Sequence, residues 1–149
     1  MTIQNILNVL KERDASFILL LCHQNADPDA LGSAYAFQGL LRRLIPEKVV
    51  EIGASDGLSR LSKHLLEHLP IAVTTKPPVE NAEAIVLLDT NTIQQLGKLA
   101  ETVTKSTAPI IVVDHHAPHP DTLQKAALSV TNEHASSTCE IVYELFKQA

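Results

Sequence analysis

The sequence predicts an α/β domain with a parallel β-sheet and helices on both faces of the sheet. Short apolar runs alternate along the chain with segments of helical periodicity, an order typical of repeated β-α units. The apolar runs lack polar alternation, which indicates strands that are buried on both sides. A length of 149 residues suits one domain, and a hydrophobic content of 45% excludes a disordered chain.

The individual elements follow from the positions of the apolar runs and of the segments with helical periodicity. The expected strands cover residues 17–22, 48–53, 71–74, 84–88, 110–113 and 128–131, with a loop at 76–83. The expected helices cover residues 3–13, 30–44, 58–69, 92–103 and 137–147. Pro46 and Pro70 end the second and third helices. Ser137 and Glu140 fit a capping box at the start of the last helix.

Charge and hydropathy limit the class of partner. With 12 basic and 17 acidic residues, the net charge of −5 argues against a broad basic surface for duplex nucleic acid. A small phosphorylated substrate or a short single strand stays compatible with this charge. The first apolar run is too short to cross a bilayer and no secretory signal is visible, so we expect no membrane partner and a cytoplasmic location. Cys22 and Cys139 are expected to be buried reduced thiols.

Three expected strands run directly into side chains that bind metals. These side chains are His23, Asp27 and Asp29 after the first strand, Asp89 after the fourth, and Asp114, His115 and His116 after the fifth. Because ligands of parallel sheets bind beyond the carboxyl ends of the strands, we expect the groups to converge at one edge. Clustered carboxylates repel each other unless a cation neutralises them. The imidazole and carboxylate mixture suits Mn²⁺, with Mg²⁺, Co²⁺ or Zn²⁺ as alternatives.

Each of these motifs also has a purely structural interpretation when it is taken alone. Asp27 or Asp29 is a good N-cap for the helix that follows. Elsewhere, His64 and His68 lie four residues apart on an expected helix, where a solvated helix face is the preferred interpretation. His119 and His134 are assigned no role as metal ligands.

Taken together, the motifs resemble the DHH phosphoesterase superfamily, which is RecJ-like, over nearly the whole chain. HQNADPDALGS (23–33) resembles the first metal motif of that family, LLDT (87–90) the second and VDHH (113–116) the third. ASSTCEIVYEL (135–145) resembles the following helix in the nanoRNase and pAp-phosphatase branch. The resemblance implies an N-terminal catalytic domain that hydrolyses phosphoester bonds in short oligonucleotides or pAp-like nucleotides. An inorganic pyrophosphatase of related fold and a non-catalytic metal- or nucleotide-binding module are the alternatives, and a homodimer is one expected assembly.

The resemblance also implies a role for each matched residue. The implied first metal site contains His23 and Asp27, the second contains Asp29 and His115, and Asp89 bridges the two ions. His116 would face the substrate phosphate, and Asp114 would orient a neighbouring histidine. Asn25 and Ser33 would support substrate binding.

The sequence departs from the resembled family after the last expected helix. In that family a further aspartate on a later strand completes the second metal site, and a smaller C-terminal domain grips the substrate. The resemblance implies that both would lie beyond Ala149. The expectation is therefore a catalytic domain over residues 1–149 that is truncated before these parts and has little or no activity alone.

Overall fold

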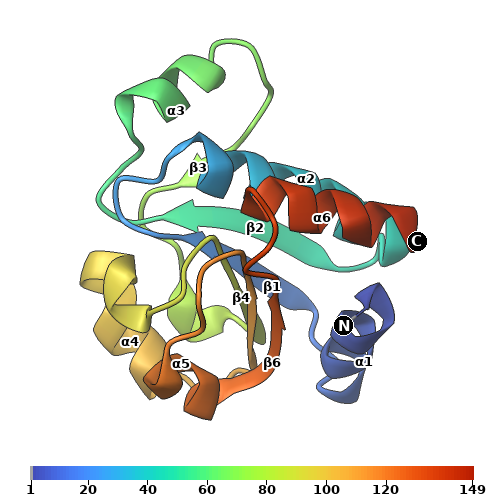
Figure 1. The fold of residues 1–149 in the computed structure, drawn as a ribbon. Coiled ribbons are helices and arrows are strands. Elements are labelled where there is room, and N and C mark those ends of the chain that lie inside the picture. Colours follow the sequence, from blue (N-terminus) through green and yellow to red (C-terminus); the bar gives the residue numbers. More distant parts are fainter. Residues whose placement is uncertain (1) are drawn as a thin grey trace.

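Six parallel strands form one sheet, in the order β3-β2-β1-β4-β5-β6, in a computed structural model that describes residues 2–149 (Figure 1). The strands are β1 (Phe17–Cys22), β2 (Val49–Ala54), β3 (Val73–Thr74), β4 (Ala84–Leu88), β5 (Ile110–Asp114) and β6 (Ala126–Thr131). The chain proceeds outward from β1 to β3, then returns to the other side of β1 for β4 to β6. The order therefore reverses between β1 and β4, and parallel sheets bind ligands beyond the carboxyl ends of the strands at such a reversal.

Helices cover both faces of this sheet, which confirms the predicted fold class. They are α1 (Ile3–Glu12), α2 (Pro28–Leu44), α3 (Arg60–Leu65), α4 (Ala100–Lys105), α5 (Pro120–Lys125) and α6 (Thr138–Lys147), with 3₁₀ helices η1 (Val79–Asn81) and η2 (Ile93–Leu99). Helices α1, α2 and α6 pack on one face, and η1, η2 and α4 pack on the other. Within residues 2–149, no helix has the length and apolar character needed to cross a bilayer.

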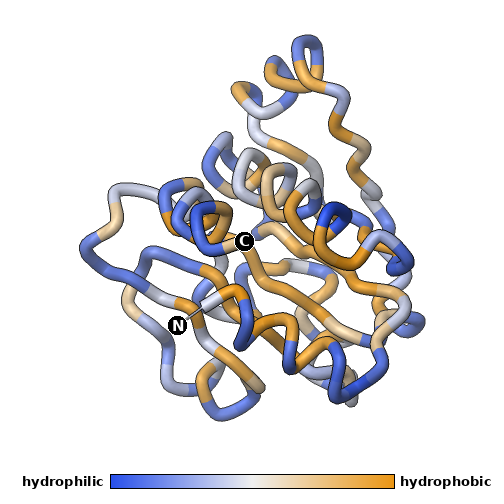
Figure 2. Tube along the Cα trace, turned by 90° about the vertical axis from the view of Figure 1, so that its right-hand side faces the viewer, coloured by the Kyte–Doolittle hydropathy of each residue, from blue (hydrophilic) through white to orange (hydrophobic). Residues whose placement is uncertain are grey.

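The central strand β1 shows why these segments lack polar alternation. Ile18 and Leu20 are fully buried against the α1, α2 and α6 face, while Leu19 and Leu21 are fully buried against the η2 and α4 face. Both faces of the strand are thus removed from water, and both select apolar side chains. Figure 2 shows the same pattern as hydrophobic colour along the central strands and hydrophilic colour in many outer turns.

Several element boundaries differ from the sequence predictions. The helix expected over 58–69 is regular only over α3 and continues as turns, and the expected loop at 76–83 contains η1. The helix expected over 92–103 is divided between η2 and α4, and it is interrupted inside η2 at Gly97, which has φ 62° and ψ −122°. Helix α5 was not predicted; Pro120 occupies its first turn, where the missing N–H costs nothing.

The two helices nearest the strand ends start differently from the prediction. Helix α2 begins two residues earlier than expected, with Asp27 as its N-cap. The N-cap of α6 is Ser137, whose hydroxyl oxygen accepts from the Glu140 amide at 3.1 Å. In the predicted capping box, the carboxylate of Glu140 would accept from the backbone amide of Ser137. It accepts instead from the amide and hydroxyl of the preceding residue, Ser136, both at 2.7 Å.

Candidate metal centre

The predicted ligands meet at the carboxyl edge of β1, β4 and β5. His23 follows β1, and its Nε2 lies 3.8 Å from Oδ1 of Asp27 and 3.7 Å from Oδ2 of Asp89. The ligand atoms of these three residues all lie within 4.8 Å of one another. A second group with the same spacing contains Asp89, Asp114, His115 and His116. Asp89 is common to both groups.

Asp89 lies at the centre of the site with a carboxylate that is almost fully buried. Its Oδ2 faces His23, whereas its Oδ1 lies 3.5 Å from Nε2 of His115 and 3.6 Å from Nδ1 of His116. The backbone of Asp89 has φ 55°, in the left-handed region that non-glycine residues rarely adopt. Its amide donates to the carbonyl of Val113 on β5 at 3.0 Å, which holds this turn in place. Strain of this kind persists where surrounding structure enforces it, often at functional sites.

The two aspartates of the first motif are both helix-capping groups and site residues. Oδ1 of Asp27 accepts from the amide of Ala30 at 2.9 Å, so the capping interpretation of Asp27 holds alongside its place in the first group. Asp29, in the first turn of α2, accepts from the amides of Thr138 and Cys139 at the start of α6, at 2.8 and 2.9 Å. Its Oδ2 also lies 3.7 Å from Nε2 of His115. Asp29 thus links α6 to the site.

Asp114 is fully buried and oriented toward His116. Its Oδ1 lies 2.8 Å from Nδ1 of His116 and accepts from the backbone amide of the same residue at 3.2 Å. Its Oδ2 has no hydrogen-bond partner among residues 2–149. The histidine that Asp114 orients is therefore His116.

Thr138 is a site residue that the sequence analysis missed. Its hydroxyl is fully buried and donates to Oδ1 of Asp89 at 2.9 Å, with Oδ1 of Asp114 at 3.5 Å. The motif around Thr138 predicts a helix start and carries a family resemblance, and we assigned Thr138 itself no role in the site. A signal was present, because Thr138 lies directly after the N-cap of the helix that follows the last strand.

A cleft of about 310 Å³ opens over the first group. It is lined by His23, Gln24, Asp27, Asp89, Gln95 and His116. The two glutamines were not predicted; the amide of Gln24 donates to the carbonyl of Gln95 at 2.7 Å, which ties η2 to the loop after β1.

The two residues expected to support substrate binding do not line this cleft. Ser33 is fully buried in α2 and donates to the carbonyl of Ala30 at 3.0 Å. Its hydroxyl is satisfied inside the helix, as happens for many helical serines. Asn25 is exposed, with φ 52° in the turn after β1. Neither position supports the predicted contact in this structure.

The carboxylates of the site raise the pKa of His23 and of His116. The carboxylate of Asp89 is the main cause that raises the pKa of His23 to about 9, against the opposing effect of burial. Burial lowers the pKa of His116, but its hydrogen bond to Asp114 and the surrounding carboxylates outweigh burial and leave the pKa above its ordinary value. Burial is also the main cause that raises the pKa of Cys22 and Cys139 to about 12, so both free thiols stay protonated.

The donor set fits a divalent cation. Among residues 2–149, none of the four carboxylates of the site forms an ion pair with lysine or arginine; their charged partners are histidines. Two of these carboxylates, Asp89 and Asp114, are buried, and the burial of uncompensated carboxylates is costly. A bound cation would neutralise them, and mixed oxygen and imidazole donors suit Mn²⁺.

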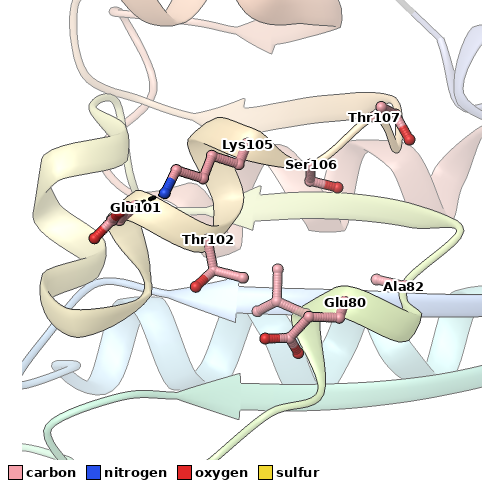
Figure 3. A pocket seen from close by; sticks show the side chains of 8 residues that line it. Glu80, Ala82, Glu101, Thr102, Lys105, Ser106 and Thr107 are labelled. Carbon is pink, nitrogen blue, oxygen red and sulfur yellow. Dashed lines mark hydrogen bonds and ion pairs between the residues drawn. The ribbon is translucent and has the colours of Figure 1, made fainter.

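Two other features lie outside both ligand groups. His64, Glu67 and His68 bring their ligand atoms within 4.8 Å, but all three are exposed on α3 and the turn after it. A hollow of about 610 Å³ between η1 and α4 is larger than the cleft (Figure 3). These elements precede β4 and β5, so the hollow lies at the amino edge of the sheet. Its lysine, Lys105, pairs with Glu101 (Figure 3).

Comparison with known proteins identifies the family. The model of the DHH family, N-terminal domain, matches residues 17–149. This chain belongs to the DHH family. The match includes both groups of ligands and the start of α6, so the predicted membership of the DHH family is confirmed.

Individual proteins that are similar to this chain are consistent with this result. The chain is 33% identical over 131 residues to an uncharacterised protein of Methanocaldococcus jannaschii, covering 88% of this chain and 39% of that protein. It is 29% identical over 137 residues to a probable manganese-dependent inorganic pyrophosphatase of Streptococcus equi subsp. zooepidemicus, covering 89% and 42%. An exopolyphosphatase-related protein of Bacteroides fragilis has the same fold, with a TM-score of 0.78 and 20% identity, covering 97% and 42%. The chain spans about two fifths of the length of these proteins.

Proposed function

We propose that this chain is the catalytic domain of a metal-dependent phosphoesterase that binds two divalent cations, with Mn²⁺ as the preferred ion. The observation that carries the proposal is the placement of Asp89. Its two carboxylate oxygens have different histidine neighbours: Oδ2 lies 3.7 Å from Nε2 of His23, and Oδ1 lies 3.5 Å from Nε2 of His115. Asp27 and Asp29 lie close to these two histidines, at 3.8 Å from His23 and 3.7 Å from His115. A carboxylate shared between two ligand groups is the usual bridge in two-metal phosphoester hydrolysis. Manganese is also named in the description of one relative.

In this proposal, three side chains would hold each of the two ions. His23, Asp27 and Asp89 would hold one ion, and Asp29, Asp89 and His115 would hold the other. Bound cations supply Lewis-acid activation of water and stabilise negative charge on the phosphoryl group. His116 lines the cleft and is held by Asp114, so its imidazole is placed to donate a hydrogen bond to a phosphoryl oxygen.

The substrate we propose is a short oligoribonucleotide or a pAp-like nucleotide. The ASSTCEIVYEL segment supports this choice through its resemblance to the nanoRNase and pAp-phosphatase branch. The cleft of about 310 Å³ accommodates a terminal phosphate at the cations while the rest of the substrate extends outward. Inorganic pyrophosphate is the second candidate, favoured by the 29% identity to a probable pyrophosphatase.

Product release in Mn²⁺ buffer tests the proposal and separates the two substrates. The whole gene product is incubated in parallel with a ribodinucleotide, with pAp and with pyrophosphate. We expect mononucleotide from the dinucleotide or AMP from pAp, with pyrophosphate left intact. Release of phosphate from pyrophosphate alone would instead identify a pyrophosphatase. A protein that binds Mn²⁺ but cleaves none of the three would be a binding module.

Asp89→Ala provides the mutational test of the bridge. Removing the shared carboxylate should abolish turnover, because both ions lose a ligand at once. Glu133→Ala, an exposed carboxylate in the loop before α6, is the matched control and should stay active. An active Asp89→Ala protein would refute the bridging role.

A further inference from the structure

We propose that Thr138 is the positioning residue of the ligand set formed by Asp29, Asp89 and His115. Its hydroxyl aims the shared carboxylate of Asp89, and its backbone amide aims Asp29. This inference rests on the proposed function, because it assigns the geometry of a site that the proposed reaction uses. It concerns the start of α6, which carries none of the predicted metal ligands.

The geometry of the group around His115 carries the inference. Two carboxylate oxygens flank Nε2 of His115, namely Oδ1 of Asp89 at 3.5 Å and Oδ2 of Asp29 at 3.7 Å. Thr138 donates to both of these oxygens, with its hydroxyl to Asp89 at 2.9 Å and its amide to Asp29 at 2.8 Å. One residue thus holds the two oxygens that would share an ion with His115.

These hydrogen bonds leave the carboxylates able to bind a cation. A carboxylate oxygen has two lone pairs, so an oxygen that accepts one hydrogen bond still has a lone pair for an ion. The bond from Thr138 occupies one lone pair of Oδ1 of Asp89 and leaves the other lone pair of that oxygen for an ion. The hydroxyl itself is fully buried and cannot exchange its partner for water.

The first ligand group does not depend on Thr138 in this way. It uses Oδ2 of Asp89, the oxygen that faces His23, whereas the hydroxyl of Thr138 bonds Oδ1. Asp27 is oriented by the amide of Ala30 instead. Loss of the hydroxyl should therefore weaken one ion much more than the other.

The test compares Thr138→Ser with Thr138→Ala, two variants that differ only in the hydroxyl. Mn²⁺ binding is measured by isothermal titration and by the electron paramagnetic resonance signal of free Mn²⁺. We expect the alanine variant to lose about 10- to 100-fold in affinity at one site, the usual effect of removing a group that orients a ligand. The other site should change little, and the serine variant should bind nearly as the wild type does.

Controls distinguish positioning from general loss of structure. Thr122→Val changes another buried threonine, on α5 away from the site, and should leave both Mn²⁺ affinities unchanged. If Thr138→Ala does not fold, Thr138→Val, which fills the same volume, replaces it. Equal weakening of both sites, or equal loss in the serine and alanine variants, would overturn the inference.

The result also distinguishes failure of this inference from failure of the proposed function. A wild-type protein that binds no Mn²⁺ would overturn the proposed function and this inference together. Wild-type binding that Thr138→Ala leaves intact would overturn only the role of Thr138. Loss confined to one site, with rescue by serine, supports the inference whatever the substrate proves to be.

Discussion

His23 and Asp89 face each other across the ends of two neighbouring strands, with Nε2 of the histidine 3.7 Å from Oδ2 of the aspartate. Through this contact the carboxylate holds a proton on the imidazole and raises the pKa of His23 to about 9. A metal ion needs the same nitrogen without its proton. A proton and a metal ion therefore compete for Nε2 of His23.

The first prediction follows from this competition. Between pH 6 and about 9, metal-free His23 is protonated, so Mn²⁺ binding should release a proton and tighten as the pH rises. Above about pH 9 the affinity for Mn²⁺ should stop rising, because His23 is then already unprotonated. Titration calorimetry at pH 7 in buffers of different ionisation enthalpy measures the release. The folding stability of the metal-free protein should change with pH in the opposite direction to the Mn²⁺ affinity. The stability that protonated His23 contributes is complete below its ordinary pKa and is lost as the pH rises through about 9.

Two variants check the source of that proton. His23→Gln should lose the release, while His64→Gln/His68→Gln, which removes the exposed histidines on α3 and its following turn, should keep it. Proton release that persists in His23→Gln would contradict the assignment.

The second prediction concerns stabilisation by metal. Mn²⁺ at about 100 times its dissociation constant should stabilise the wild-type protein by about 2.7 kcal/mol, because it binds the folded state alone. Asp89→Asn should fold, since asparagine tolerates the left-handed backbone at this position. Its melting temperature, however, should no longer respond to Mn²⁺. Asp121→Asn, an exposed carboxylate on α5, should respond as the wild type does, and a normal Mn²⁺ response in Asp89→Asn would remove Asp89 from the site.

The third prediction couples the cap of α6 to the site. Ser137→Ala should lower the free energy of unfolding by about 1 kcal/mol, the typical cost of a lost N-cap. It should also weaken Mn²⁺ binding, because α6 starts with the amides that hold Asp29. Thr2→Ala removes the cap of α1 and should cost similar stability, measured by urea unfolding, without affecting Mn²⁺. Equal Mn²⁺ affinity in both variants would argue against the coupling.

The fourth prediction concerns the break at Gly97 inside η2. A Cβ at position 97 would lie 2.5 Å from Oδ2 of Asp56 and 2.9 Å from Oε1 of Gln24, and Gly97 already has positive φ. Gly97→Ala should therefore destabilise the protein by about 1–3 kcal/mol. Gly39, exposed within α2, has open space around it, so Gly39→Ala should stabilise by up to about 1 kcal/mol. Thermal unfolding of both variants measures the contrast, and a neutral Gly97→Ala would show that the turn relaxes.

Much of the fold follows from local pattern. Apolar runs such as β1 and β4 are buried on both faces, so their composition alone identifies parallel strands. The convergence of His23, Asp89 and His115 was predictable for a related reason, since parallel strands bring their carboxyl ends to one edge. Short elements such as α5 and the break at Gly97 were not predictable, because they depend on turns whose geometry tertiary contacts select.

By itself, the sequence determined the class of fold, the edge of the sheet that carries the site and the chemical type of its ligands. These properties depend on periodicity and on residues adjacent to strand ends. Only the tertiary structure decided which oxygen of Asp89 faces which histidine, that Asp29 accepts from the first amides of α6, and that the hydroxyl of Thr138 reaches Asp89. Those contacts join segments far apart in the chain, and their geometry is set by how α6 packs against α2 and β5.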